Sequence, residues 1–375
     1  MAGACLAIHM YFRNVQDPRR APRHLLLDII GIAICAVIAG ANDWQQIATF
    51  AHDRRAWLQR FFQLPNGIPS HDTFERVFER LNPRAFAAAF RQWMHALADA
   101  VGLRQVAIDG KTLRRSGSAS RGLGPLHLVS AWATENHLRL AQVAVDDKSN
   151  EITAIPELLE LLDVHGALVT IDAMGCQKAI AQKIVDGGGH YILTVKENQE
   201  HLLADIQQAL VTASEQDFAG MNHDTYECRE RGHGREEYRC YTVLHNTEGL
   251  RGRAEWAGLT TIGLCYSQRT VGGKISEEAR YFIGSKVASA RYYGKGLRNH
   301  WGIENSLHWQ LDVTFGEDRN REQGRQAAVN LAMVRKLALV LLKQQPGKQS
   351  IACKRLHAAL DVAFLEQTVR RAANF

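Results

Sequence analysis

The chain has 375 residues, of which 46% are hydrophobic and 22% are charged. This length suffices for two or three domains with a large buried core, which excludes a small disulfide scaffold and a disordered tail protein. The net charge of +6 is unevenly spread: residues 1–100 carry 11 basic and 8 acidic side chains, 101–285 carry 19 and 24, and 286–375 carry 15 and 7. Basic flanks around an acid-rich middle fit an enzyme that holds a polyanion, although solvated helix faces give the same pattern.

The cysteines and the most apolar stretch indicate where such a protein works. The seven cysteines are scattered and never spaced as CxxC, which favours a reducing cytoplasm over a disulfide frame or a structural zinc site. The apolar run 25–41 is about 17 residues long and contains Asp28, so it predicts a buried helix and no membrane anchor. We therefore expect a soluble cytoplasmic protein.

The first hundred residues have a helical pattern. Helices are predicted over 25–38, 44–62, 70–81 and 83–100, and Ser70 is placed to cap the third of them. Residues 1–100 thus form an all-helical domain, which would either bind DNA and support dimerisation or serve as a plain packing module.

From residue 101 the pattern changes to alternating strands and helices. Strands are predicted over 105–110, 126–134, 138–145, 167–172 and 191–195, with helices over 150–162 and 177–185. This β-β-β-α-β-α-β order predicts an α/β fold with a mixed sheet flanked by helices.

Beyond Lys196 the chain leaves and later rejoins this core. A helix over 201–213 precedes four strands, 225–231, 237–244, 259–267 and 278–283, which predict a mainly β insertion over 200–285. Helical pattern returns over 286–309 and 325–343, so we assign 101–199 and 286–345 to the core. Residues 346–375 form a basic helical tail with a helix that begins near Ser350.

Two predicted core strands end in aspartate, Asp109 and Asp172. Groups at strand ends of an open α/β sheet converge on the ligand crevice, and neighbouring strands lie roughly 5 Å apart. Two such carboxylates suit Mg²⁺, which prefers oxygen ligands, and a pair of ions can promote phosphoryl displacement. Each aspartate by itself could equally be a turn or capping residue.

A third candidate set lies in the segment 298–318. His300, Glu304 and His308 are spaced four residues apart and would share one helix face, a spacing that permits a zinc site. Alternatively Glu304 joins Asp109 and Asp172 as a third carboxylate, while His300 and Arg298 contact phosphate.

These segments resemble a known family. Residues 107–114 (AIDGKTLR), 170–177 (TIDAMGCQ) and 300–309 (HWGIENSLHW) are similar to the three signature blocks of the DDE transposases of ISAs-type insertion sequences, which include the H-repeat-associated proteins. The segments 17–19, 69–74 and 335–339 also resemble the family, so the similarity covers most of the chain.

The resemblance implies a ribonuclease-H-like core of the retroviral-integrase superfamily, with Asp109, Asp172 and Glu304 as catalytic and metal-binding triad. Two Mg²⁺ or Mn²⁺ ions would support cleavage at terminal inverted repeats and transfer of the 3′-hydroxyl into target DNA. The wider group carries a Tyr, Arg, Glu, Lys signature, and the places of its Tyr, Arg and Lys here hold Leu297, His300 and Leu311. We therefore expect Arg298, His300 and His308 to grip the terminal phosphate.

Further basic and aromatic residues are expected at double-stranded DNA, which the resemblance implies is bound by a homodimer at the bacterial nucleoid. The expected phosphate contacts are Lys111, Arg114, Arg115, Lys196 and, on a hairpin arm, Arg235. Trp132, Trp301 and Trp309 would either stack on a displaced base or pack in the core.

Two other functions remain open from the sequence. A metal-dependent nuclease or resolvase would use the same triad without joining strands. An inactive DNA-binding relic of a mobile element would have no reason to keep all three acids.

Overall fold

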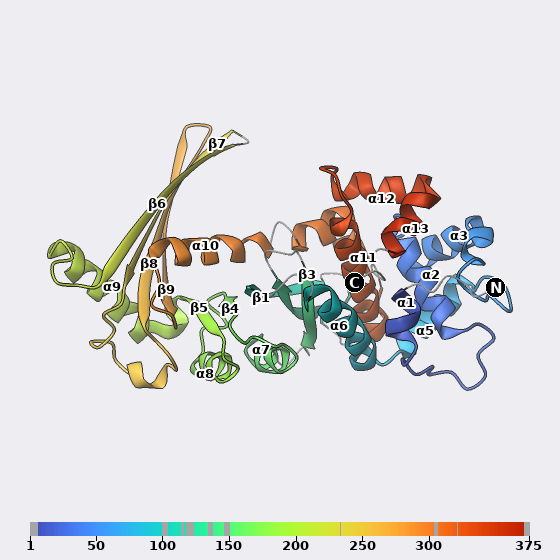
Figure 1. The fold of residues 1–375 in the computed structure, drawn as a ribbon, viewed down its shortest axis with the longest axis horizontal. Coiled ribbons are helices and arrows are strands. Elements are labelled where there is room, and N and C mark those ends of the chain that lie inside the picture. Colours follow the sequence, from blue (N-terminus) through green and yellow to red (C-terminus); the bar gives the residue numbers. More distant parts are fainter. Residues whose placement is uncertain are drawn as a thin grey trace.

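The protein is elongated in the computed structural model, with a β-rich arm at one end and a group of helices at the other (Figure 1). The structure describes residues 7–99, 104–113, 116–117, 124–133, 138–145, 151–232, 234–303, 307–320 and 322–370. Two predicted contacts, Arg114 and Arg115, and the predicted third carboxylate, Glu304, lie outside these ranges.

The secondary structure follows the chain in this order. The helices are α1 (Ala7–Phe12), α2 (Leu26–Ile38), α3 (Trp44–Asp53), α4 (Arg55–Leu58), α5 (His71–Arg80), α6 (Pro83–Asp99), α7 (Glu151–Glu160), α8 (Lys178–Asp186), α9 (Glu200–Glu215), α10 (Ala290–His300), α11 (Arg325–Gln344), α12 (Ile351–Leu360) and α13 (Val362–Arg370). The strands are β1 (Gln105–Leu113), β2 (Leu126–Ala133), β3 (Leu138–Val145), β4 (Leu168–Ile171), β5 (His190–Val195), β6 (His223–Gly232), β7 (Arg235–Leu244), β8 (Thr261–Val271) and β9 (Lys274–Gly284).

The described strands form one nine-stranded sheet in the order β3-β2-β1-β4-β5-β9-β8-β7-β6. Its first part has an antiparallel meander, β1 to β3, followed by β4 and β5, which run parallel to β1. The predicted β-β-β-α-β-α-β order is confirmed, and with it the α/β fold of ribonuclease-H-like type. The parallel neighbours β1 and β4 run in the same direction, and β1 continues to Leu113 beyond their last pair, Ile108 with Ile171.

The insertion continues the core sheet. Strand β9 pairs antiparallel with β5, with Val195 opposite Tyr281, and β8, β7 and β6 follow in turn. The four predicted strands are present, but each is longer than its hydrophobic alternation indicated. They extend past the core as the arm in Figure 1, and α10 crosses from this arm back toward the helical end.

The apolar run near the N-terminus is a buried core helix, as predicted. Helix α2 packs against α3, α11 and α13, and its Asp28 carboxylate accepts hydrogen bonds from the backbone of Gln63 and Leu64. These bonds satisfy a charge that would otherwise be costly to bury. No helix in the described ranges is long and apolar enough to cross a membrane.

Some predicted helix boundaries are wrong. The single helix predicted over 44–62 is two helices, α3 and α4, which meet at Arg54. The helix predicted over 286–309 begins at Ala290 and ends at His300, and a π-helical turn, Gln310–Thr314, follows later. Ser70 caps α5 as predicted, since its hydroxyl accepts a hydrogen bond from the backbone of Thr73 at 3.3 Å.

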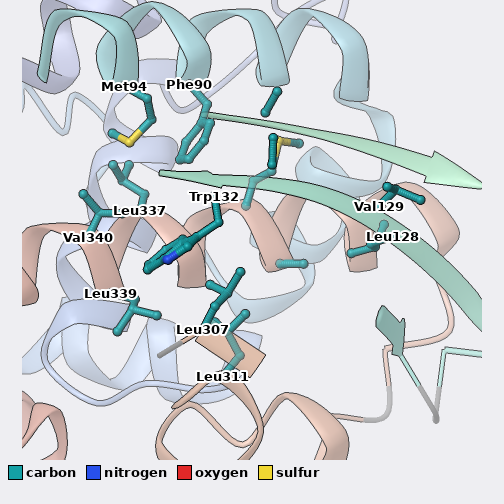
Figure 2. Close-up of a cluster of buried hydrophobic side chains, with 14 of the residues drawn as sticks. Phe90, Met94, Leu128, Val129, Trp132, Leu307, Leu311, Leu337, Leu339 and Val340 are labelled. Atoms are coloured by element: carbon teal, nitrogen blue, oxygen red, sulfur yellow. The ribbon is translucent and has the colours of Figure 1, made fainter. Parts of the chain in front are cut away.

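Helix α11 joins the core sheet to the N-terminal helices. It packs against α2, α5 and α6 as well as β3, so the helix predicted to close the core also fills the centre of the N-terminal helices. Figure 2 shows Trp132 of β2 among side chains of α6, α11 and the segment that contains Leu307 and Leu311. Trp132 is 1% exposed, which assigns it to the core and excludes the base-stacking role.

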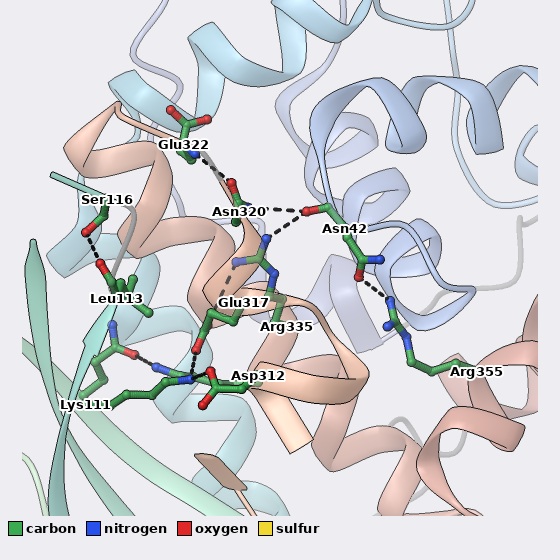
Figure 3. Close-up of polar contacts among 12 residues, drawn as sticks. Asn42, Lys111, Leu113, Ser116, Asp312, Glu317, Asn320, Glu322, Arg335 and Arg355 are labelled. Atoms are coloured by element: carbon green, nitrogen blue, oxygen red, sulfur yellow. Dashed lines mark hydrogen bonds and ion pairs between the residues drawn. The ribbon is translucent and has the colours of Figure 1, made fainter. Parts of the chain in front are cut away.

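A buried ion cluster lies under the same helix (Figure 3). The Lys111 ammonium pairs with Glu317 at 2.6 Å and with Asp312, and Arg335 of α11 lies 4.0 Å from Glu317. Burial opposes ionisation of Glu317, but Lys111, Lys336 and Arg335 outweigh it and lower its pKa from 4.5 to about 2. Through Glu317, these ion pairs connect β1 with α11.

Replacing the buried carboxylate tests this account. We expect Glu317→Gln to lower the free energy of unfolding at pH 7 by about 3–5 kcal/mol, because the cations around it lose their countercharge. Urea denaturation measures the change. Glu255→Gln, which breaks the exposed Lys178–Glu255 pair, is the control and should cost no more than about 1 kcal/mol.

The same variant changes the pH dependence of stability. A carboxyl group with a depressed pKa stabilises the fold above its unfolded pKa and loses this contribution as pH falls through the folded value. For Glu317 the loss runs from about pH 4.5 down to about pH 2. Glu317→Gln should flatten the stability curve in this window, and an unchanged curve would contradict the assignment.

Candidate functional site

The two predicted aspartates lie side by side at one edge of the core sheet. In the parallel pair β1 and β4, Ile108 is opposite Ile171, so Asp109 and Asp172 follow matched positions on strands roughly 5 Å apart. Both line one groove of about 860 Å³. The structure therefore brings together the first two members of the predicted triad.

Local hydrogen bonds fix the Asp172 carboxylate. Its Oδ1 atom accepts from the backbone of Met174 at 3.1 Å and Gly175 at 3.4 Å in the turn after β4. Burial raises the pKa of Asp172, the nearby Glu151 carboxylate raises it further, and Lys196 opposes the shift. The site thus destabilises a negative charge that a bound cation would stabilise.

Both predicted histidines are buried beside the aspartates. His308 Nδ1 lies 3.4 Å from Asp109 Oδ2. His300 Nδ1 lies 3.1 Å from the hydroxyl of Thr170, which lies on β4 two residues before Asp172. His300 also lines the groove. The described residues contain no group of three possible metal ligands. The predicted zinc site includes Glu304, which lies outside the described residues, so that site stays a prediction.

The chain on both sides of residues 304–306 reaches this site. Ile303 lines the groove, and His308 pairs with Asp109. The position of Glu304 itself stays a prediction, because it falls outside the described residues.

Several of the predicted basic residues line the groove. Lys196, which follows β5, is joined there by Arg235 of β7 and Arg298 of α10. Three further arginines line it: Arg239, Arg269 and Arg280. Acidic residues of the arm lie among them and form ion pairs, such as Arg298 with Glu230 at 2.6 Å.

Lys111, unlike these basic residues, is not among the residues that line the groove. Its side chain is 9% exposed and its ammonium is held by Asp312 and Glu317 (Figure 3). Burial disfavours the charge, but the two carboxylates outweigh this and raise the pKa of Lys111. The prediction that Lys111 contacts DNA phosphate is therefore wrong, and the residue has a structural role.

Two tryptophans near the site differ in setting. Trp301 lines the groove, with the Arg280 guanidinium 4.2 Å from its ring centroid. Trp309 is 52% exposed on the segment that carries His308.

Glu151 and His127 were not predicted from the sequence. Glu151 starts α7, and its Oε1 atom lies 2.6 Å from Nε2 of His127 on β2. The signal that was available is a carboxylate in the first turn of the helix that follows the strand meander.

Comparison with known proteins gives the family context of this site. The family model described as DDE_Tnp_1-associated matches residues 9–94, and the one described as Transposase DDE domain matches residues 102–341. The chain is 40% identical to "Putative transposase YncI" of Escherichia coli O157:H7, over 96% of this chain and 93% of the relative. It is 38% identical to "H repeat-associated putative transposase YhhI" of Escherichia coli K12, over 91% of each chain.

The raised pKa of Asp172 leads to a stability prediction. Because its raised pKa means that folding opposes its charge, Asp172→Asn should raise the free energy of unfolding of the metal-free protein at pH 7 by about 0.5–2 kcal/mol. The asparagine oxygen can still accept the two backbone hydrogen bonds. Thermal and urea denaturation in chelator measure the change, and exposed Asp53→Asn is the control, expected within about 0.5 kcal/mol of the original chain. A loss of stability in Asp172→Asn would contradict the account.

Proposed function

The chain belongs to the family of transposases with a DDE domain, and we propose that it is an active DNA transposase. It would cleave the ends of an element at terminal inverted repeats and join the 3′-hydroxyl to target DNA. The observation that carries this proposal is the pair Asp109 and Asp172, which come directly after the last pair of the parallel strands β1 and β4 and line one groove together with arginines.

The donor atoms at the site fit divalent cations. Carboxylate oxygens are the ligands that Mg²⁺ and Mn²⁺ prefer, and the pKa of Asp172 is raised because burial and Glu151 outweigh the backbone hydrogen bonds and Lys196 that stabilise its charge. We propose that Asp109, Asp172 and Glu304 hold two such ions, which supply activation of the attacking hydroxyl and stabilisation of the leaving oxygen.

The surrounding residues would position the ligands and the DNA. His308 contacts Asp109 and would orient its carboxylate, while His300 is held by Thr170 at the groove wall. Lys196 and Arg298 would bind phosphates on either side of the aspartates and neutralise charge that develops during displacement. Arg235 would track the DNA backbone from the arm.

Two ends of an element must be held together for joining. We propose that a homodimer binds the two inverted repeats and the target duplex, with the chromosomal DNA of the bacterial cytoplasm as its place of action. Arg114 and Arg115, which follow β1 in sequence, are proposed as further phosphate contacts.

Substitution of the proposed ligands tests catalysis. Asp109→Asn, Asp172→Asn and Glu304→Gln should each reduce Mg²⁺-dependent cleavage and joining by about 10³-fold or more, because several kcal/mol of transition-state stabilisation is lost. The assay uses a duplex with the inverted repeats that flank the reading frame, and gel shift measures DNA binding, which should change little.

Exposed Glu157→Gln serves as the control and should keep full activity. Full activity in any ligand variant would remove that residue from the triad. Cleavage by the unsubstituted chain without any joined product would favour the nuclease, and binding without cleavage would favour the relic.

Salt dependence tests the DNA contacts. Lys196→Gln and Arg298→Gln should each weaken DNA binding and reduce the slope of log affinity against log salt by about 0.9, because one phosphate contact is lost. Lys178→Gln is the matched control, since Lys178 is exposed and pairs with Glu255 away from the groove. Equal slopes in all three variants would contradict the assignment of the groove.

A further inference from the structure

Strand β6 forms an open edge of the nine-stranded sheet, because the strand order ends with it (Figure 1). It is ten residues long and pairs with β7 in one unbroken register, from His223 opposite Leu244 to Gly232 opposite Arg235. The strand contains no proline, and no bulge interrupts the pairing. Within the described ranges, no other element forms backbone hydrogen bonds with residues 224–232. The outer side of β6 is therefore a straight row of backbone groups that a further strand can extend.

The arm has a second open edge, along the outer half of β9. The pairing of β9 with β5 begins only at Tyr281. The part of β9 before this residue borders the groove, since Ser276, Glu278 and Arg280 line it. The proposed DNA substrate would occupy that side of the arm, which leaves β6 as the edge for a protein partner.

The charges on β6 select one way for the strand to pair with its own copy. Charged side chains on an edge strand normally prevent pairing between chains, because like charges come to lie opposite each other. Two identical antiparallel strands have a twofold axis through a residue that faces itself. An axis at Glu227, Arg229 or Glu230 sets like charges against each other. An axis at Cys228 instead places Glu227 of each copy opposite Arg229 of the other, and pairs residues 224–232 with no like charges opposed.

Glu227 and Arg229 are available for such a contact. Both side chains are exposed, and strand alternation places them on the face of the arm opposite to Glu230. In the described part of the chain, the ion pairs of β6 are made by Glu230 and Arg231. The Arg229 guanidinium lies 5.1 Å from the ring centroid of Tyr238 on β7, which keeps it beside the strand. A second chain would therefore find an ordered cation and an exposed carboxylate at matching positions.

We propose that β6 pairs antiparallel with β6 of a second copy of this chain, around a twofold axis at Cys228, and so joins the two sheets into one. This inference deepens the homodimer of the proposed function and rests on it, because that function requires two copies. A twofold axis between antiparallel edge strands is perpendicular to the sheet. The arginine-lined grooves of the two copies would therefore open on the same side of the joined sheet.

Reversal of the edge charges tests the interface. Sedimentation equilibrium of the full chain without DNA measures dimerisation, and thermal melting checks folding. The original chain should be a dimer, and Glu227→Arg or Arg229→Glu should each weaken dimerisation by about tenfold or more, because like charges then face each other twice. The double variant exchanges the two charges and should restore dimerisation. Glu248→Arg, an exposed position in the loop after β7, is the matched control and should dimerise as the original chain does.

Thiol cross-linking tests the axis without changing any charge. The starting chain carries Cys353→Ser, which removes an exposed thiol on α12. A short bismaleimide should join two copies of this chain through Cys228. Adding Cys228→Ser should abolish the cross-linked dimer, whereas adding Cys240→Ser on the neighbouring strand should not. A dimer that is still cross-linked after Cys228→Ser would place the axis elsewhere and overturn the inference.

The outcomes separate this inference from the proposed function. A monomeric original chain at every concentration, or a Glu227→Arg variant that dimerises as the original chain does, would rule out the β6 interface and leave the cleavage assay to decide catalysis. Failure of the double variant to recover would rule out the register at Cys228. Full cleavage by Asp172→Asn would refute the proposed triad, while the β6 interface, measured without DNA, would stand.

Discussion

The position of the candidate site depends on the buried pairing of β1 with the segment before α11. Asp109 and Lys111 lie two residues apart on β1 and share one face of the strand, while His308 and Asp312 lie four residues apart on the helical segment. Two strand residues span about 6.6 Å, and four residues of the π-helical segment make roughly one turn, so each segment presents its two side chains on one face. Asp109 meets His308, and Lys111 meets Asp312. A shift of either segment would break both contacts together.

This pairing connects the helical end with the sheet that carries the candidate site. Glu317 binds Lys111 from the sheet and faces Arg335 of α11, and Arg335 also donates to the backbone oxygen of Asn42 after α2 (Figure 3). Buried charges are costly to leave unpaired, so each member holds the others in place. A residue two positions from a proposed metal ligand is thereby connected to the N-terminal helices.

Much of the fold could be predicted because the signals are local. Asp28 within the apolar run distinguished α2 from a membrane span, and Ser70 marked the start of α5. The break at Arg54 left no glycine or proline signal, and the order of strands in the sheet depends on long-range pairing that periodicity does not encode. Hence the insertion was predicted as strands, but its continuation of the core sheet through β5 and β9 was not.

The site was predictable where a residue ends a strand. Asp172 follows β4 as predicted, whereas Asp109 lies within β1, which continues to Leu113, and the structure places the two aspartates together where the β1–β4 pairing ends. Lys111 was misassigned because a basic residue near a strand end looks the same whether it faces DNA or a buried carboxylate. Strand alternation places Lys111 on the same face as Asp109, where the carboxylates of Asp312 and Glu317 bind its ammonium group. Glu151 was missed because only the pairing of β2 with β1 brings His127 to it.

The charge of the groove is better understood as a set of oriented guanidinium groups than as a net excess of positive charge. Arg239 is held by Glu230 and Glu237, and Arg298 by the same Glu230. The Arg298–Glu230 pair is solvent-exposed and contributes only about 0–1 kcal/mol, so a phosphate would replace this carboxylate at little cost, whereas the Arg239–Glu237 pair is largely buried. Such pairs would keep the arginines ordered before the proposed DNA substrate arrives. The modest net charge of +6 is therefore compatible with the proposed DNA groove, because recognition would depend on the arrangement of these cations and not on their sum.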